Sequence, residues 1–376
     1  MKITHVETYA VRIPLKPERR MISSLGKHEV SRYVLVRIGT DSGVEGVGEA
    51  TVMPRWSGET VWGCRELVDR LFAPIIIGCD LRDPSSVDAI AERLEAVARH
   101  NWFAKSAIDM ACFDALGRAA GKPVYELLGG PCRDRTFRCR FSMGAYDLER
   151  ARRTAAERVS AGFTTIKVKV GGESDDDLAR VRAVREVIGP DLALDIDANC
   201  GWSAETAIRK VKALADCRLA LVEQPTPDGD YEAIARVRRE TGATIMADDM
   251  CFDLVHAREL VRNQACDVLN VYPGKQGGLA PARRMVEFAA THGIACTIGS
   301  NLEWDVATAA MAHLITACPN MQVERFPGDA LGPIYHETSI VKNPLSIAGP
   351  LVTTPDGPGL GVDVDWAAVR ANLLTD

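Results

Sequence analysis

The chain lacks a long apolar run and a basic tract, and each absence excludes a class of partner. No uninterrupted apolar stretch approaches the roughly 20 residues that a membrane-spanning helix needs. The formal net charge is −6, and no basic tail or arm supplies the electrostatic footprint of nucleic-acid binding. We therefore expect no membrane partner and no nucleic-acid partner.

Paired cysteines are also missing, although the chain holds eleven cysteines in all. None forms a C-x-x-C pair, and Cys112, Cys251 and Cys296 lie in apolar segments, where cysteine behaves as a small hydrophobic residue. The N-terminal segment alternates apolar and polar residues, unlike a secretory signal with a basic start and an apolar core. We therefore expect the cysteines to be free thiols in a reducing compartment, and the protein to be cytoplasmic.

The first third of the chain has the pattern of a small α+β domain. Residues 2–13 and 31–39 alternate as strands, and Asp41-Ser42-Gly43 forms a turn before the next strand, which predicts an antiparallel sheet. Residues 1–130 are therefore expected to form a capping domain, completed by the strand-rich tail 335–376. Helical spacing predicts helices at about 58–72, 84–99 and 101–120.

Between residues 131 and 334, strand patterns and amphipathic helical patterns alternate. This alternation predicts parallel strands, and eight of them in this length predict a closed TIM-type α/β barrel. A doubly wound open sheet is the alternative, but no Gly-x-Gly-x-x-Gly turn follows the first strand. The eight β-rich runs are TFRCRFS, TTIKVKV, LALDIDA, LALVEQP, TIMADD, DVLNVYP, ACTIGS and MQVERF.

Acidic residues recur at the ends of three consecutive predicted strands. Asp197, Glu223 and Asp248 are separated by one strand-helix unit each, so they are expected on the carboxyl-end rim, where such barrels carry their chemistry. Any one of them alone would more simply be a helix cap or a salt-bridge partner. Three unpaired carboxylates repel one another, and a cation relieves that repulsion. All-oxygen ligands favour Mg²⁺, with Mn²⁺ as the alternative.

Lysines are predicted on both sides of this group. Lys167 and Lys169 are two residues apart on one strand and share a face, while Lys275 lies four strands further on, across the barrel. Two neighbouring ammonium groups near a metal should lower each other's pKa and provide a base at neutral pH. A metal between opposed lysines predicts removal or delivery of a proton next to a carboxylate, through an enolate.

These motifs together resemble the enolase superfamily, in its muconate lactonizing enzyme (muconate cycloisomerase) subgroup. The resemblance extends to the capping segments TDSGVEGVGEA and GPGLGVDVD and covers nearly the whole chain. It implies a modified (β/α)₇β barrel, a small carboxylate substrate and a homo-oligomer, often an octamer. The motifs that carry it are Lys167-Val-Lys169, Asp197-Ala-Asn199, Glu223-Gln-Pro225, Met246-Ala-Asp248-Asp249 and Lys275-Gln-Gly-Gly278.

The resemblance also implies a role for each motif residue. Asp197, Glu223 and Asp248 would be the metal ligands, and Lys169 and Lys275 the acid/base pair. Lys167 would assist electrostatically, while Asn199 and Asp249 would orient the ligands. Two positions depart from the family pattern, which often has Glu in place of Asp249 and Lys in place of Tyr272.

Several reactions remain open within the superfamily. None of the seven histidines lies at the end of the seventh strand, which excludes the mandelate-racemase-like subgroup. Glu324 at the predicted eighth strand matches a Glu of muconate-lactonizing members, and Glu324-Arg325-Phe326 departs from the Asp-x-Asp of dipeptide epimerases. A muconate-type cycloisomerase is therefore the first hypothesis. A racemase or epimerase of an amino-acid derivative comes next, then a hydroxy-acid dehydratase.

Outside the superfamily, a metal-dependent hydrolase would need a His-x-His on the first strand, which FRCRFS lacks. Substrate selection is expected from the capping loops 16–28 and 51–58. In them Arg55 is a candidate for a distal carboxylate of the substrate, and Trp56 for an apolar wall. The simpler interpretation of each is an exposed surface residue. The candidate substrate contacts on the barrel are Tyr272, Ser300 and Glu324.

Overall fold

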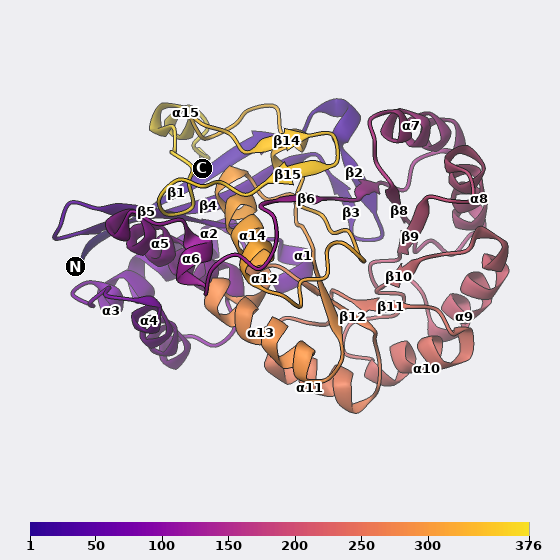
Figure 1. Ribbon diagram of the computed structural model, residues 1–376, viewed down its shortest axis with the longest axis horizontal. Helices are drawn as coiled ribbons and strands as arrows, with labels where there is room; N and C mark the ends of the chain where they lie inside the picture. Colours follow the sequence, from indigo (N-terminus) through magenta and orange to yellow (C-terminus); the bar gives the residue numbers. More distant parts are fainter. Residues whose placement is uncertain (376) are drawn as a thin grey trace.

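The computed structural model describes residues 1–375 and places a barrel beside a smaller lobe of antiparallel strands and helices (Figure 1). The strands are β1 (Ile3–Pro14), β2 (Met21–Ser23), β3 (Gly26–His28), β4 (Val30–Thr40), β5 (Glu45–Ala50), β6 (Thr136–Arg138), β7 (Phe141–Met143), β8 (Thr165–Lys169), β9 (Ala193–Asp197), β10 (Leu221–Glu223), β11 (Ile245–Ala247), β12 (Val268–Val271), β13 (Ala295–Ile298), β14 (Ser346–Ala348) and β15 (Leu351–Thr353).

The helices connect and cover these strands. The α-helices are α1 (Pro54–Ser57), α2 (Val61–Leu67), α3 (Ala73–Ile76), α4 (Pro84–Val97), α5 (Trp102–Ala120), α6 (Val124–Leu127), α7 (Leu148–Ser160), α8 (Asp176–Ile188), α9 (Ala204–Ala213), α10 (Tyr231–Thr241), α11 (Leu254–Arg262), α12 (Pro273–Gln276), α13 (Leu279–Thr291), α14 (Asp305–Ala317) and α15 (Trp366–Ala371). Shorter turns are the 3₁₀ segments η1 (Pro17–Arg19), η3 (Ala215–Cys217) and η4 (Gly332–Tyr335), and the π segment η2 (Val68–Phe72). No described helix is long and apolar enough to cross a membrane.

The capping lobe is built on the antiparallel sheet β1-β4-β5, as the alternating sequence predicted. Helix α5 lies across this sheet and is buried along most of its length. Close contact depends on Gly48, because a Cβ there would lie 1.8 Å from the carbonyl oxygen of Ala107. The missing side chain therefore lets the β5 backbone lie directly against the helix.

The barrel consists of parallel strands in the order β7 to β13, with helices around the outside (Figure 1). Residues 320–329 take the place of an eighth strand. On one side the Gln322 amide donates to Cys296 of β13, and on the other the Arg140 amide, just before β7, donates to the Gly328 carbonyl. The barrel is thus closed, which confirms the predicted fold class.

Two predicted strands are wrong in detail. The run TFRCRFS splits into β6 and β7, and β6 pairs with β15 outside the barrel. The run MQVERF forms only an isolated bridge at Met321, followed by a turn, because Phe326 and Arg325 donate their amides back to Gln322. Strand propensity alone therefore predicts an eighth strand that is longer than the one in the structure, because a turn satisfies the hydrogen-bonding groups of this backbone instead.

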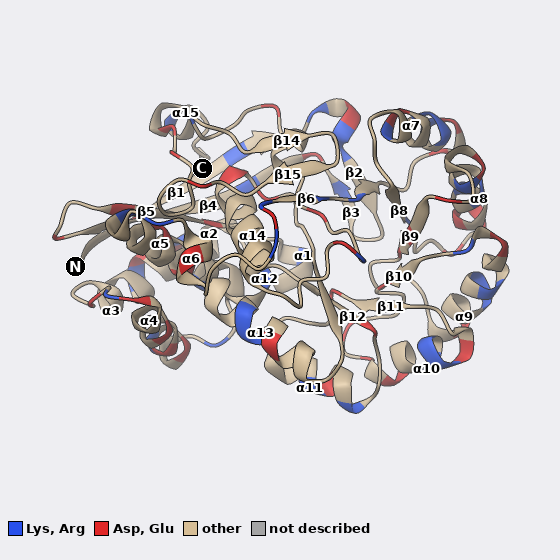
Figure 2. Cartoon of the chain, in the orientation of Figure 1, with Lys and Arg blue, Asp and Glu red and all other residues tan. Residues whose placement is uncertain are grey.

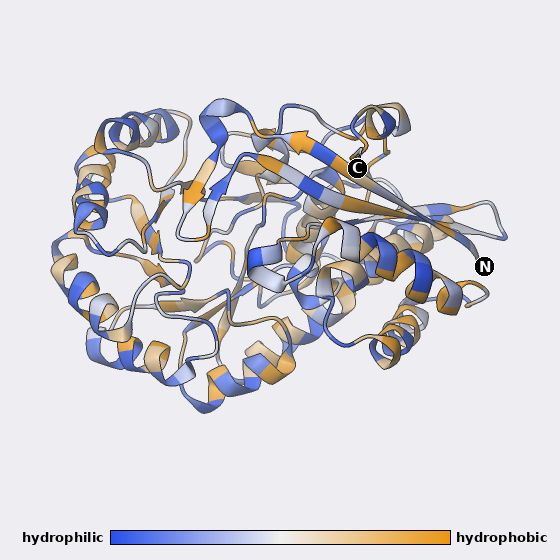
Figure 3. Ribbon diagram, turned by 180° about the vertical axis from the view of Figure 1, so that it is seen from behind, coloured by the Kyte–Doolittle hydropathy of each residue, from blue (hydrophilic) through white to orange (hydrophobic). Residues whose placement is uncertain are grey.

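The tail after η4 returns to the rest of the chain in two places. Leu373 bridges Val11 of β1, and the Leu374 amide donates to Ala10, so the end of the tail reaches the capping sheet as predicted. Strands β14 and β15 instead add to β6. Charged residues are frequent on the outer helices α7 to α10 (Figure 2), and these helices also carry hydrophobic residues (Figure 3).

Candidate active site

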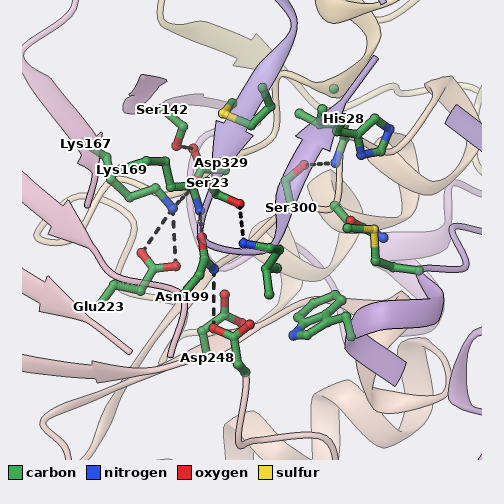
Figure 4. Close-up of a pocket in the computed structure, with 18 of the residues that line it drawn as sticks. Ser23, His28, Ser142, Lys167, Lys169, Asn199, Glu223, Asp248, Ser300 and Asp329 are labelled. Carbon is green, nitrogen blue, oxygen red and sulfur yellow. Dashed lines mark hydrogen bonds and ion pairs between the residues drawn. The ribbon is translucent and has the colours of Figure 1, made fainter. Parts of the chain in front are cut away.

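A pocket lies at the carboxyl ends of the barrel strands, beneath the β2–β3 hairpin of the capping lobe (Figure 4). The Ser24 hydroxyl fastens this hairpin to the barrel by donating to the carbonyl oxygens of Ala198 and Asn199, at 3.1 and 2.7 Å. The Arg55 guanidinium donates to the Leu25 carbonyl at 2.7 Å and supports the same hairpin. The cap therefore supplies one wall of the pocket and the barrel supplies the floor.

Three carboxylates end consecutive strands at this floor. Asp197 and Glu223 are the last residues of β9 and β10 and are paired in the sheet register, and Asp248 follows β11 directly. All three are buried, with exposed fractions of 0%, 1% and 7%. The sequence predicted this grouping because the ends of parallel strands meet at one rim of a barrel.

The electrostatics of Glu223 reflect the crowding of these carboxylates. Burial, followed by the neighbouring charge of Asp197, raises the pKa of Glu223 to about 8. Burial also acts on Asp197, but Lys169 and Lys167 outweigh it and hold the Asp197 pKa below its usual range. Acidic side chains this close lower their energy by taking up a proton or a cation.

Asp197, Glu223 and Asp248 fit a divalent cation, because they offer carboxylate oxygens at the ends of neighbouring strands. Each carboxylate is currently turned toward an ammonium group: Asp197 to Lys169 at 2.5 Å, Glu223 to Lys167 at 3.1 Å and Asp248 to Lys275 at 2.6 Å. Accordingly, no three His, Cys, Asp or Glu side chains among residues 1–375 converge closely enough to hold an ion as they stand.

Lys167 and Lys169 both point into the pocket from β8, as their spacing predicted (Figure 4). Lys167 contacts Asp197, Glu223 and Asp329 at 3.1 to 3.2 Å. Burial and Arg140 act to lower its pKa, but the three carboxylates outweigh them and raise it. The predicted lowering of the Lys167 pKa is therefore wrong, and this side chain stays a cation.

Lys169 lies at the edge of the same group and is partly exposed. Its ammonium donates to Asp197 Oδ2 at 2.5 Å and to Asn199 Oδ1 at 2.6 Å. Asn199 also approaches Asp249, with 3.4 Å between its Nδ2 and Asp249 Oδ2. Asn199 therefore links the lysine to the carboxylate behind the strand ends.

Lys275 lies in helix α12 after β12, beside Asp248, and is buried behind the pocket lining. Its ammonium is fully buried and donates to Asp248 Oδ1 and to the carbonyls of Asp248 and Asn270. Aromatic rings surround it, with the Tyr272 ring centroid 4.5 Å from Nζ and that of Trp56 at 5.6 Å. The Tyr272 hydroxyl donates to Asp248 at 3.2 Å, so Tyr272 contacts the same carboxylate as Lys275.

Two residues of the site were missed from the sequence. Asp329 enters the pocket from the segment that closes the barrel, and Arg140 lies fully buried just before β7. The Arg140 guanidinium contacts Asp329, Glu223 and Asp195, at 2.8, 2.7 and 3.3 Å. The available signal was a charged residue inside the run FRCRFS, where a buried strand should be apolar.

The prediction that Glu324 contacts the substrate is wrong. Its side chain is 65% exposed and pairs with Arg133, in a surface groove lined by Thr164 and Asp191 at the amino-terminal ends of β8 and β9. Arg55 is likewise exposed and supports the hairpin without lining the pocket. Of the other candidates, Trp56, Tyr272 and Ser300 do line it.

Comparison with known proteins identifies the family. Residues 3–129 match the model of the mandelate racemase/muconate lactonizing enzyme N-terminal domain, and residues 150–368 match the enolase C-terminal domain-like model. A hydrophobic dipeptide epimerase of Enterococcus faecalis is 36% identical over 96% of this chain and 99% of its own length. Muconate cycloisomerase 1 of Rhodococcus opacus is 32% identical over 98% of each chain.

Solved structures agree with the sequence relatives. The N-succinyl Arg/Lys racemase of Bacillus cereus superposes with a TM-score of 0.94 at 28% identity, over 100% of this chain and 99% of that one. The E. faecalis dipeptide epimerase, complexed with Mg and the dipeptide L-Leu-L-Tyr, gives a TM-score of 0.90 at 35% identity, over 96% and 100%. The chain therefore belongs to the enolase superfamily, in the muconate lactonizing enzyme subgroup of the mandelate racemase/muconate lactonizing enzyme family, and is an enzyme.

Proposed function

We propose that this enzyme racemises or epimerises an amino-acid derivative at the carbon next to its carboxylate, with Mg²⁺ as cofactor. The observation that carries the proposal is the placement of Lys169 and Lys275 on opposite sides of the three strand-end carboxylates. Inversion at a carbon needs a proton acceptor on one face and a proton donor on the other. Relatives named as epimerases and racemases support the same reaction.

In this proposal the residues around the strand ends bind the metal and add charge. Asp197, Glu223 and Asp248 would hold Mg²⁺, which supplies positive charge beside the substrate carboxylate when bound. Asn199 and Asp249 lie around this set. Lys167, kept cationic by its carboxylate neighbours, adds a fixed positive charge to the same region.

Lys169 and Lys275 carry out the two proton transfers. A neutral Lys169 takes the α-proton from one face, and the electron pair of the broken C–H bond passes into the carboxylate to give an enolate. A protonated Lys275 then delivers a proton to the opposite face, which inverts the carbon. The reverse direction exchanges the two roles, so each lysine serves one enantiomer.

Cycloisomerisation of a muconate-type diacid is the second candidate. It is supported by relatives such as the chloromuconate cycloisomerase of R. opacus, whose structure gives a TM-score of 0.93 at 30% identity. The sequence argument for it rests on the overall resemblance, on Glu324 and on the absence of an Asp-x-Asp motif, and of these Glu324 lies outside the pocket. Its loss moves racemisation ahead of cycloisomerisation.

The test is proton exchange in D₂O, followed by NMR, with the Mg²⁺-loaded enzyme and a panel of N-acylamino acids, dipeptides and muconate. We expect deuterium at the α-carbon together with inversion. Lys169→Ala and Lys275→Ala should each lower racemisation by about 10²- to 10⁴-fold, while each keeps exchange with one enantiomer. Turnover of muconate without α-exchange in any amino-acid derivative would contradict the proposal and favour the second candidate.

A further inference from the structure

Three buried charged side chains hold the loop that follows Lys169, and what we infer from them rests on the proposed function. The loop, residues 170–175, joins β8 to α8, and most of it is exposed. Asp177 and Arg180 lie on α8 and Lys210 on α9, with exposed fractions of 5%, 9% and 0%. None of these three side chains lines the pocket. They therefore act on the reaction only through the groups that they hold.

Asp177 shapes the turn of this loop. Its Oδ2 accepts the backbone amides of Gly171 and Gly172 at 2.9 and 2.8 Å. Gly171 has a φ of 111°, a conformation that residues with a side chain rarely adopt, and a Cβ there would lie 2.4 Å from the Ala198 carbonyl oxygen. The chain therefore turns sharply just after β8, against the residue that follows β9, and Asp177 satisfies the amides of that turn.

Arg180 holds the peptide group of Lys169 itself. Its Nη1 donates to the Lys169 carbonyl oxygen at 3.2 Å, and the Val170 amide of the same peptide group donates to the Asp197 carbonyl at 2.8 Å. Its Nε donates to the Tyr146 carbonyl at 2.6 Å, in the loop after β7. The peptide group between Lys169 and Val170 is thus fixed at both ends, so the Lys169 side chain leaves the backbone from a defined position.

Lys210 completes the group from the neighbouring helix. Its ammonium donates to the carbonyl oxygens of Gly172 and Ser174 at 2.9 and 2.6 Å and lies 3.6 Å from Asp177 Oδ2. Arg180 Nη1 donates to the other oxygen of Asp177 at 2.8 Å. One buried carboxylate therefore joins two buried cations, and each cation also holds a carbonyl of the strand end or of the loop.

Stability of the loop is a weak reason for this arrangement. Buried ion pairs lose much of their attraction to the cost of leaving water, and apolar side chains of similar size often stabilise a fold as well. What the three charges supply is direction, because their hydrogen bonds fix one peptide group. Direction matters for a proton acceptor, since a displacement of about 1 Å costs about 10²-fold in rate.

Lys169 depends on this support more than Lys275 does. Lys275 makes three hydrogen bonds through its buried ammonium, all to residues in β12 or next to β11. The Lys169 side chain is partly exposed, and its ammonium donates to Asp197 and Asn199. Because Asp197 is a proposed ligand of the metal, the backbone is the anchor of Lys169 that does not depend on the metal.

We propose that Asp177, Arg180 and Lys210 are positioning residues for Lys169, and that they govern proton transfer on one face of the substrate α-carbon only. Their contacts go to one another, to Lys169 and the loop after it, and to the loop after β7. The contacts of Lys275 go to β11 and β12 instead. A merely structural role would affect both faces, since both lysines depend on the same folded barrel.

The test measures α-exchange in D₂O separately for the two epimers of the fastest-exchanging N-acylamino acid or dipeptide, with the full Mg²⁺-loaded enzyme. Arg180→Lys keeps the positive charge beside Asp177, but a single ammonium cannot reproduce the fork that reaches both carbonyls. We expect kcat to fall at least about tenfold for the epimer that Lys169→Ala no longer exchanges, with KM and the other epimer within about twofold. Lys210→Met should act in the same direction.

The matched control is Arg182→Met, on the same helix α8. Arg182 lies in a half-exposed ion pair with Asp216, and its loss should leave the exchange of both epimers unchanged. Equal losses for both epimers in Arg180→Lys, or no loss for either epimer, would overturn the proposal.

Crystal structures of the parent and of Arg180→Lys give a readout that needs no activity. The Lys169 ammonium should shift by at least about 0.5 Å, while the Lys275 ammonium overlays that of the parent. If no compound of the panel exchanges, the proposed function fails and this comparison decides alone. A shift of Lys169 with Lys275 in place supports the positioning role, whereas overlay of both ammonium groups, or displacement of both, overturns it.

Discussion

The Lys275 ammonium donates to Asp248 Oδ1 at 2.6 Å, and it also donates to the carbonyl oxygens of Asp248 and Asn270, each at 2.8 Å. All three of its protons are therefore used inside the protein. A cation that drew the Asp248 carboxylate away would free one of these protons toward the pocket. If Asp248 holds a metal and Lys275 is the second proton donor, as proposed, this one ion pair would couple metal binding to the availability of that proton.

The first prediction concerns the metal site. Glu223→Gln removes one charged ligand from the floor, and we expect Mg²⁺ affinity, measured by calorimetry, to fall at least about tenfold. Glu324→Gln is the matched control, because Glu324 lies in an exposed ion pair with Arg133 outside the pocket. Chelation should abolish α-exchange and Mg²⁺ should restore it. Equal affinity in the two variants would remove Glu223 from the site.

The second prediction concerns Tyr272. Tyr272→Phe keeps the ring over Lys275 but loses the 3.2 Å hydrogen bond to Asp248, so the exchange rate should fall only about 2- to 10-fold. Tyr272→Ala also removes the ring and admits water beside the ammonium, and should lose considerably more. NMR exchange rates across a pH series measure both. An alanine variant as active as the phenylalanine variant would show that the ring is dispensable.

The third prediction concerns the joint between the two lobes. Glu49 of β5 is fully buried and accepts the backbone amides of Trp304 and Ala307 at 2.6 and 3.1 Å, which caps helix α14 from another element. Glu49→Ala leaves these amides unpaired, so the free energy of unfolding should fall by about 1–3 kcal/mol. Urea denaturation measures this loss, with the exposed Glu337→Ala as control. A change no larger than the control's would argue against the cap.

The fourth prediction is a pH dependence of stability. Burial lowers the pKa of His313 from 6.5 to about 4. The unfolded chain therefore takes up a proton at higher pH than the folded one, so stability is complete above about pH 6.5 and falls as the pH drops toward 4. The shift corresponds to about 3 kcal/mol across that window.

The variant that checks this is His313→Gln, since His313 accepts from the Tyr125 amide and contacts the Leu360 carbonyl within the core. We expect a lower stability at neutral pH but a shallower decline between pH 6.5 and 4, measured by urea unfolding at each pH. If the free energy of unfolding declines equally in parent and variant, other groups cause the acid sensitivity. One such group is the buried His336, whose pKa is also lowered, to about 3.

Much of the active site could be predicted from the sequence. Asp197, Glu223 and Asp248 recur at nearly equal intervals, and parallel strands joined by similar connections must bring such positions to one rim. Lys167 and Lys169 share a face because a strand alternates every two residues. The family followed from the same motifs, because each was short, local and fixed to a strand end.

The tertiary structure alone decided which residues line the pocket. Segment 320–329 holds its place through isolated bonds to Cys296 and to the residue before β7, contacts that no local pattern encodes. For that reason Glu324 was assigned to the pocket and Asp329 was overlooked. The position of the β2–β3 hairpin likewise depends on Ser24, which meets Asn199 from 175 positions away. Strand-end chemistry is local and periodic, whereas charge pairing and pocket walls arise from contacts between distant segments, which only the folded chain brings together.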